Sequence, residues 1–211
     1  MSRAAAPLPA EQFARLLATG AVRFGLSLSP ASISGLSHYL AQLDRWRRRI
    51  NLAGVLSPEE LTNHALESLV GAPLVPPRAE VIDIGSGGGL PGIPIAVLRP
   101  DVRVTLLEPR GKRLAFLRHV SRTLSLQNAI PLAGRAEDLP EATWNLATLR
   151  GLGDLPKVLG GGSFLTPAGA LLVWTTAPQT LASTLVGRFQ LERTVPVPSS
   201  QRKQIAVFRK R

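Results

Sequence analysis

Cysteine is absent from this chain, and aromatic residues make up only 5% of it. Without cysteine there is no disulfide framework, no thiolate metal site and no cysteine nucleophile. The start of the chain, MSRAAAPLPAEQF, lacks an apolar run of signal-peptide length, and no run elsewhere reaches the length of a membrane span. We therefore expect a cytoplasmic protein with no membrane partner. The 3 histidines are dispersed, so we also expect no metal site.

Acidic residues are scarce as well: 14 Asp and Glu stand against 25 Lys and Arg, which gives a net charge of +11. Such an excess favours a polyanionic partner, because basic side chains that neutralise phosphates release counterions. A GC-rich genome that favours arginine would give the same excess, so composition alone leaves both explanations open. The basic residues cluster at 45–49, 110–113 and 202–211. Trp46, inside the first cluster, either stacks a base or packs in the core.

Residues 1–78 carry the signals of helices. The pairs Ser29–Pro30 and Ser57–Pro58 each combine an N-cap residue with a proline suited to the first helical turn. Glu60 completes a capping box with Ser57. Apolar residues follow each pair at helical spacing. We therefore expect an N-terminal helical cap over residues 1–78.

From residue 79 onward, short apolar runs alternate with helical segments. This alternation is typical of a parallel sheet that is covered by helices on both faces. The runs over residues 190–197 and 202–210 predict a final hairpin, which would add an antiparallel strand. We expect residues 79–211 to form an α/β, Rossmann-like, mostly parallel and doubly wound sheet that makes one compact unit.

The stretch VIDIGSGGGLPGIPIAV joins a predicted strand to a predicted helix through a run of glycines. Glycine permits positive φ and close approach of a ligand to the backbone, and the helix that follows offers free N–H groups. The dinucleotide pattern G-x-G-x-x-G fits at Gly85 and Gly87 but meets Leu90 at its third glycine. The pattern acid-x-G-x-G-x-G, typical of S-adenosylmethionine sites, fits at Asp83, Gly85, Gly87 and Gly89. A tight turn without a ligand is the third interpretation.

Glu108 ends the next predicted strand, about twenty residues beyond the glycine loop. An acid at this place can accept both ribose hydroxyls of a nucleoside. Alternatively, it is a solvated carboxylate in a turn. The loop and Glu108 together predict a nucleoside cofactor and leave the choice between S-adenosylmethionine and a nicotinamide dinucleotide open.

Longer stretches around the loop resemble a known family. DIGSGGGLPGIPIAVLRPDVRVTLLEPRGKRLAFLRHV is similar to the glucose-inhibited division protein B family, with GLPGIP and GKR..FLR as its most specific parts. Upstream, RWRRRINLAGVLSPEELTNHALESL resembles the family's W-N-x-x-x-N-L…H-x-x-(D/E)-S segment, and downstream GRAEDL resembles the loop after the third strand. The resemblance covers residues 36–152 well. It implies an S-adenosylmethionine-dependent methyltransferase that acts on N7 of a guanine in 16S ribosomal RNA, free or within the 30S subunit.

The resemblance also implies roles for individual residues. Gly85 and Leu90 would line the methionine end of S-adenosylmethionine, Ala136 and Glu137 would flank the adenine, and Arg150 would act in catalysis beside cofactor and substrate. The full set of expected cofactor contacts is Asp83, Gly85, Gly87, Gly89, Leu90, Glu108, Ala136, Glu137 and Arg150. The expected RNA contacts are Arg47, Arg48, Lys112, Arg113 and Arg135. We expect the protein to act as a monomer.

Three segments depart from the family's pattern on the substrate side. Leu149, Gly151 and Leu152 surround Arg150 where the family usually has Ser-Arg-Ala-Phe. In the predicted fifth strand, LLVWTTA, Thr175 stands where the family usually has a lysine, and Asn63 stands where an arginine commonly precedes the histidine. These departures keep open a non-catalytic RNA-binding protein of the same fold.

The residues narrow the reaction without the resemblance. Methylation of cytosine C5 normally uses a cysteine nucleophile, which this chain lacks. The stretch LRGLG, at the end of the predicted strand WNLATLRG, lacks the Asn/Asp-Pro-Pro-aromatic segment that is usual for methylation of exocyclic amines. Guanine N7 already carries a lone pair, so placement of donor and acceptor in line can suffice. A small-molecule methyltransferase remains an alternative, although it would leave the basic clusters without a role. His64 and Glu67, three residues apart, are expected as a structural hydrogen-bonded pair, or else as an RNA contact.

Overall fold

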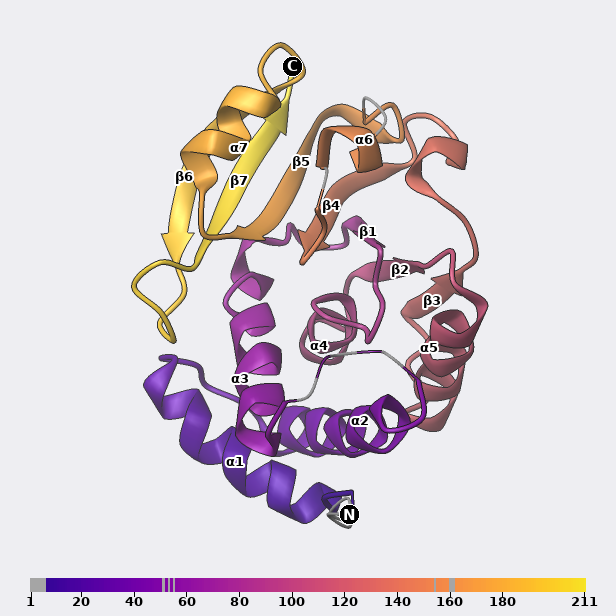
Figure 1. Ribbon diagram of the computed structural model, residues 1–211, viewed down its shortest axis with the longest axis vertical. Helices are drawn as coiled ribbons and strands as arrows, with labels where there is room; N and C mark the ends of the chain where they lie inside the picture. Colours follow the sequence, from indigo (N-terminus) through magenta and orange to yellow (C-terminus); the bar gives the residue numbers. More distant parts are fainter. Residues whose placement is uncertain (1–6, 51, 53, 55, 154, 160–161) are drawn as a thin grey trace.

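The computed structural model describes residues 7–50, 52, 54, 56–153, 155–159 and 162–211. In this part of the chain, a seven-stranded sheet with the order β3-β2-β1-β4-β5-β7-β6 forms the centre of the molecule (Figure 1). The strands are β1 Glu80–Ile84, β2 Arg103–Leu107, β3 Ala129–Leu132, β4 Trp144–Arg150, β5 Leu165–Thr175, β6 Phe189–Pro196 and β7 Gln204–Lys210. The α-helices are α1 Ala10–Arg23, α2 Pro30–Arg47, α3 Pro58–Leu69, α4 Gly92–Leu98, α5 Gly111–Thr123, α6 Leu155–Leu159 and α7 Pro178–Thr184. Short 3-10 helices lie at Ala72–Leu74 and Ala136–Asp138.

The sheet confirms the predicted mixed architecture. Strands β3, β2, β1, β4 and β5 run parallel, whereas β7 pairs antiparallel with both β5 and β6. In β1 and β2 the four residues after the first are all buried, as expected for central strands covered on both faces. None of the helices in the described part of the chain combines the length and apolarity that crossing a bilayer requires.

Two apolar clusters pack on the two faces of the sheet. One contains α4 and α5 together with the N-terminal helices, so that Phe13, Leu40 and Leu66 share a core with Val81 and Val104. The other, on the opposite face, contains residues of α6 and α7. Figure 1 shows α1, α2 and α3 gathered at one end of the molecule, with the β6–β7 hairpin at the far edge of the sheet. The helical cap and the sheet are therefore packed through a common core, although the boundary at residue 78 stays a prediction.

The capping signals place α3, which carries part of the site. Ser57 Oγ accepts from Glu60 N at 3.2 Å, and Glu60 Oε2 accepts from Ser57 N at 2.6 Å, so the predicted capping box is confirmed. Pro58 occupies the first helical turn, where a backbone N–H has no partner within the helix, so its missing N–H costs no hydrogen bond. The helix buries Glu67 and Ser68 against the sheet.

The order of the strands determines where a ligand can enter. The chain winds outward from β1 to β3 on one side and continues through β4 on the other, so β1 and β4 are neighbours at the point where the direction reverses. In open α/β sheets this reversal opens a crevice at the carboxyl ends of the strands. The glycine loop after β1, Glu108 after β2, Arg150 in β4 and Thr175 in β5 all lie at this edge.

Candidate functional site

The glycine loop is held in place from two directions. Gly85 has φ +68° and Gly87 has φ +53°, in the left-handed region that favours glycine. The Gly87 N–H donates to Glu108 Oε2 at 3.0 Å. From the cap, the buried Tyr39 hydroxyl donates to the Gly88 carbonyl oxygen at 2.7 Å. The end of β2 and helix α2 therefore fix the loop together, and sequence reasoning missed the contribution of Tyr39.

Asp83 sits in β1 with both carboxylate oxygens engaged. Its Oδ1 accepts from the Thr148 hydroxyl at 2.8 Å, and its Oδ2 accepts from the Gly92 N–H at 3.2 Å. Gly92 allows this contact, because a Cβ there would lie 2.4 Å from Leu106 Cδ2. Burial raises the pKa of Asp83 to about 6, with the hydrogen bonds opposing it. The geometry makes Asp83 a tie between β1, β4 and the start of α4, and its contact with a cofactor stays a prediction.

The raised pKa of Asp83 gives a testable pH dependence. Since the folded state holds the proton more tightly than the unfolded chain, this contribution to stability is full below pH 3.8 and is lost as the pH rises through about 6. A rise from 3.8 to about 6 corresponds to about 3 kcal/mol. In chemical denaturation from pH 3.5 to 7.5, the free energy of unfolding of the wild type should fall by this amount relative to that of Asp83→Asn. Parallel curves for the two proteins would contradict the assignment.

Glu108 ends β2 and is buried beside the loop. Its Oε2 accepts from Gly87 and its Oε1 accepts from the Arg110 N–H at 2.9 Å. Two backbone donors thus fix the carboxylate beside the glycine loop. The structure therefore brings Glu108 and Gly87 together, as the sequence predicted, and the ribose contact stays a prediction.

An apolar cavity of about 220 Å³ lies at the carboxyl ends of β1, β2 and β3. Gly85 and Leu107 form one wall, and Ala136 and Glu137 approach from the loop after β3. A flat aromatic ring suits such a lining. The two residues expected beside an adenine are thus brought into one cavity with Gly85. Leu90, in contrast, packs against the core shared by the cap and the sheet.

A second, more polar cavity of about 410 Å³ adjoins the first, and Leu152 lines both. A Cβ on Gly85 would lie 2.8 Å from Leu152 Cδ2, so only a glycine leaves room for this side chain next to the loop. The lining comes from the ends of β4 and β5, from α3 and from the turn before β7. Its residues are His64, Glu67, Arg150, Gly151, Leu152, Trp174, Thr175, Thr176, Lys203 and Gln204.

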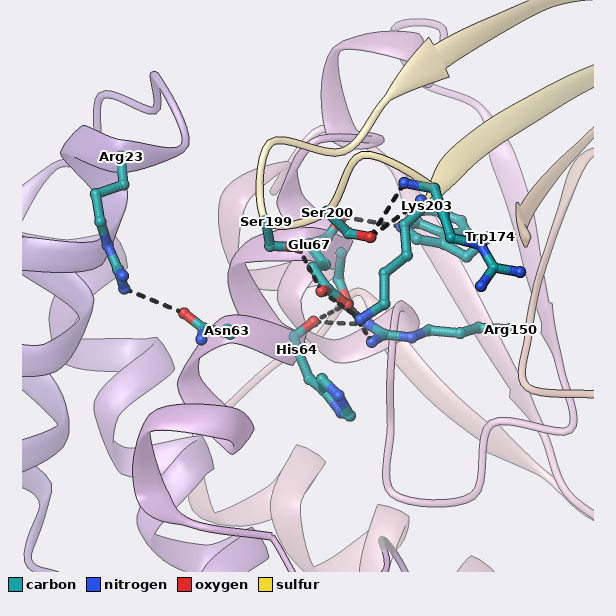
Figure 2. Close-up of polar contacts among 11 residues, drawn as sticks. Arg23, Asn63, His64, Glu67, Arg150, Trp174, Ser199, Ser200 and Lys203 are labelled. Atoms are coloured by element: carbon teal, nitrogen blue, oxygen red, sulfur yellow. Dashed lines mark hydrogen bonds and ion pairs between the residues drawn. The ribbon is translucent and has the colours of Figure 1, made fainter. Parts of the chain in front are cut away.

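Glu67 is the centre of a charged network in this second cavity (Figure 2). Its Oε2 pairs with Arg150 Nη2 at 2.6 Å. Its Oε1 accepts from Lys203 Nζ at 2.7 Å and from the Ser199 hydroxyl at 2.6 Å. Burial alone would raise the pKa of Glu67, but the hydrogen bonds from Lys203 and Ser199 and the charge of Arg150 hold it below its usual value. The carboxylate is therefore ionised at neutral pH.

Arg150 is held by α3 through more than the ion pair. Its Nη1 donates to the His64 carbonyl oxygen at 2.7 Å and to the Ser68 hydroxyl at 3.1 Å. Its side chain is 15% exposed, and the residue lines the cavity. The guanidinium thus has a fixed position at the end of β4, where the sequence predicted the catalytic residue. The catalytic role itself stays a prediction.

The expected hydrogen bond between His64 and Glu67 is wrong. Within the described residues no hydrogen bond to the His64 imidazole is found, because the Glu67 carboxylate turns toward Arg150 and Lys203. The imidazole instead lines the second cavity. Burial and the charge of Arg150 lower its pKa, so the ring is neutral at pH 7.

Sequence reasoning placed Lys203 in the third basic cluster but missed its contact with Glu67. Lys203 lies 136 residues from Glu67 in the chain, and no local pattern connects the two. Thr175 in β5 pairs with Gln204 in β7, and this pairing brings Lys203, the residue before Gln204, to the end of β5. Lys203 and Thr175 therefore line the same cavity.

Asn63 is another position that departs from the family's pattern. Its Oδ1 accepts a hydrogen bond from Arg23 of α1 at 3.3 Å (Figure 2).

A basic cleft of about 400 Å³ lies where the end of α2 meets the start of α5. It is lined by Arg49, Ile50, Arg110, Gly111, Lys112 and Arg113, and we call it the basic cleft. Two of the expected RNA contacts, Lys112 and Arg113, are brought together here. Arg49 follows the end of α2, whereas Arg110, Lys112 and Arg113 lie at the start of α5, so basic side chains from two segments line the cleft.

The other expected RNA contacts lie elsewhere. Arg47 and Arg48 pair with the buried Asp44 at 2.7 and 3.1 Å, and Arg47 is only 10% exposed at its side chain. Arg135 stands at the rim of the first cavity, 3.6 Å from a Glu137 carboxylate oxygen. Trp46 packs against Phe116, with ring centroids 5.7 Å apart, as the core interpretation predicted. Among the described residues, no group of three or more acidic or histidine side chains could hold a metal ion.

Comparison with protein families gives one match that covers most of the chain. The model of GidB, rRNA small subunit methyltransferase G, matches residues 32–175. The chain is 43% identical over 149 residues to the ribosomal RNA small subunit methyltransferase G of Xanthomonas axonopodis pv. citri, covering 69% of this chain and 70% of that protein. It is 40% identical over 169 residues to the protein of the same name from Stenotrophomonas maltophilia, covering 79% and 78%.

Solved structures agree on the fold. A SAM-dependent methyltransferase from Aquifex aeolicus superposes with a TM-score of 0.58 at 15% identity, covering 70% of this chain and 90% of that one. The B. subtilis M1A22 tRNA methyltransferase TrmK superposes with a TM-score of 0.56 at 17% identity, covering 68% and 64%. At such low identity these likenesses show the Rossmann-like methyltransferase fold and nothing finer.

Proposed function

This chain belongs to the GidB family, rRNA small subunit methyltransferase G, and from that membership we propose that it transfers a methyl group from S-adenosylmethionine to N7 of a guanine in 16S ribosomal RNA. The observation that carries the proposal is the pair of adjoining cavities at the carboxyl edge of the sheet. The apolar cavity would hold the adenine of the cofactor, and the polar cavity would hold the RNA base. Leu152, which lines both, would contact both ligands.

The residues present suit S-adenosylmethionine. Gly85 and Gly87 leave the backbone of the loop accessible, Glu108 presents a carboxylate at its edge, and Ala136 and Glu137 line the apolar cavity. When bound, this cofactor supplies an electrophilic methyl group. Because guanine N7 carries its own lone pair, the chain needs no general base and contributes by orienting the base and excluding water.

Arg150 would orient the guanine. Its position is set by three acceptors on α3, so its guanidinium faces the polar cavity without freedom to swing. A fixed fork of N–H donors can hold the base edge while N7 points at the methyl group. The neutral His64 ring lines the same space and adds no charge that would repel Arg150.

The basic cleft would hold the RNA backbone. Arg49, Arg110, Lys112 and Arg113 line a single depression, and phosphate contacts of this kind set the register of a nucleic acid without reading its sequence. Arg135, which lines the apolar cavity, is a further proposed RNA contact. Arg47 and Arg48 remain proposed contacts to the RNA, and both guanidinium groups already pair with the Asp44 carboxylate.

The basic cleft can be tested by charge removal. The double variant Arg49→Gln/Lys112→Gln should bind 16S RNA more weakly, and the slope of log K against log salt should fall by about two, since each lost phosphate contact contributes about one. Filter binding from 50 to 300 mM salt would measure this. Arg118→Gln is the matched control, because Arg118 is exposed on α5 outside the cleft. Equal slopes for the double variant and the control would remove the cleft from the RNA surface.

The reaction itself is tested with radiolabelled S-adenosylmethionine. The protein would be incubated with 30S subunits and with free 16S RNA, both from cells that lack this enzyme, and the label mapped by chain cleavage at 7-methylguanine. We expect label at one guanine, in one or both forms of the RNA. Label at another kind of atom would overturn the N7 assignment. Cofactor binding without any label would favour the non-catalytic RNA-binding alternative.

We further propose that the protein acts in the cytoplasm as a monomer, with 16S RNA or the 30S subunit as its partner. This proposal rests on the family and on the absence of any bilayer-spanning helix in the described residues. The nicotinamide-dependent oxidoreductase, which Leu90 already disfavoured, is set aside by the family membership.

A further inference from the structure

The turn between β6 and β7 carries Lys203 into the polar cavity. Val197 N–H donates to the Lys203 carbonyl oxygen at 3.0 Å, and Ser200 N–H donates to the Val197 carbonyl oxygen at 3.1 Å. The Ser200 hydroxyl also accepts from the Arg202 and Lys203 N–H groups at 3.2 and 3.4 Å (Figure 2). The turn is therefore internally hydrogen-bonded, and it presents Lys203 from a defined position.

This turn lies outside the part of the chain that the family model matches. The match ends at residue 175, whereas Ser199 and Lys203 reach back to Glu67 inside it. The C-terminal hairpin thus completes a cavity whose other walls come from the matched region.

The charges in the cavity do not balance. The Glu67 carboxylate faces two cations, Arg150 and Lys203, which leaves a formal surplus of one positive charge. Glu67 does not depend on Lys203 for its hydrogen bonds, because Ser199 donates to the same oxygen at 2.6 Å. If the ammonium moved away, the buried carboxylate would keep both Ser199 and Arg150 as partners.

The two cations also differ in freedom. The Arg150 side chain is 15% exposed and bonded to three groups of α3, whereas that of Lys203 is 42% exposed and has Glu67 as its ion-pair partner. A lysine ammonium has three donors on a flexible stem and binds phosphate as a point charge. Lys203 is therefore the mobile charge at the mouth of the cavity.

We propose that Lys203 is a substrate-positioning residue, whose ammonium leaves Glu67 to pair with a phosphate oxygen of the RNA when the target nucleotide enters the polar cavity. This inference rests on the proposed function, since the nucleotide is taken to be part of an RNA. Thr175 and Gln204 line the same cavity and would lie beside the entering nucleotide. Ser199 and Arg150 hold Glu67 in place throughout.

The test compares three variants of the full chain. Lys203→Gln removes the charge and Lys203→Arg keeps it. Lys210→Gln is the matched control, because Lys210 ends β7, the strand that follows Lys203, and its ammonium donates to the Leu165 carbonyl oxygen outside the polar cavity. For Lys203→Gln we expect the Kd for 16S RNA to rise about tenfold and its salt slope to fall by about one. The Kd for S-adenosylmethionine should stay at the wild-type value, and the melting temperature should fall less than in Arg150→Ala, since Glu67 keeps Ser199 and Arg150. Lys203→Arg should restore most of the RNA affinity, and Lys210→Gln should change nothing.

The two possible failures are distinguishable. Absence of methyl transfer by the wild type would count against the proposed function, whereas the RNA affinity of the variants reports on Lys203 alone. An unchanged RNA affinity and salt slope in Lys203→Gln would overturn the inference. So would a loss of stability with unchanged RNA affinity, because Lys203 would then only support Glu67.

Discussion

Arg150→Ala is expected to lower kcat about 100-fold, while the protein remains folded and binds S-adenosylmethionine. The fixed guanidinium is the group that would hold the base edge, and its loss would leave the base free to rotate away from the line of attack. A misplacement of about 1 Å can cost about 100-fold in rate. Single-turnover methylation with saturating RNA would measure the effect on the transfer step.

Stability must be separated from turnover in this variant. Removing one partner of a buried ion pair can cost about 3–5 kcal/mol, but Glu67 keeps Lys203 and Ser199. We therefore expect a loss of about 2 kcal/mol, seen as a fall in melting temperature of about 4–8 °C. Arg150→Lys preserves the charge but not the fork of donors, and it should be closer to the wild type in stability than in rate. Wild-type turnover in either variant would remove the assigned role of Arg150.

Gly87→Val is expected to weaken S-adenosylmethionine binding by at least about 100-fold, which corresponds to about 3 kcal/mol. Gly87 has φ +53°, where a β-branched residue is strained, and its N–H is the donor to Glu108. A side chain at this position would disturb both the loop and the carboxylate that the cofactor is proposed to meet. Isothermal titration calorimetry with the cofactor would measure the loss.

A control variant separates the effect of backbone strain from the effect on the cofactor site. Gly25 has φ +64°, nothing lies within 4 Å of its Cβ position, and it is not among the residues that line either cavity. Gly25→Val should therefore cost a similar amount of stability, about 1–2 kcal/mol, and leave cofactor binding unchanged. Cofactor binding that survives Gly87→Val, or that is lost equally in Gly25→Val, would contradict the location of the cofactor site.

The sequence by itself determined the parts of this protein that depend on neighbouring residues. The spacing of residues close together in the sequence predicts the capping box at Ser57 and Glu60 and the strand-loop-helix unit around Gly85. The structure contains both. Glu108 could be placed near the loop because parallel strands end at the same edge of a sheet. Local periodicity was enough for each of these, since no distant segment competes for the same backbone.

Only the tertiary structure decided which charged side chains meet. The first basic cluster was one uniform stretch in the sequence, yet Arg47 turns to the buried Asp44 while Arg49 lines the basic cleft. Glu67 could not be assigned to Arg150 and Lys203 rather than His64, because the pairing depends on α3 packing against β4 and on β7 lying beside β5. The contacts of Glu67 with Arg150 and Lys203 span 83 and 136 residues, and no periodicity in the sequence reveals contacts over such separations. Many cations could pair with one buried carboxylate, and only the strand order determines which of them lie near it.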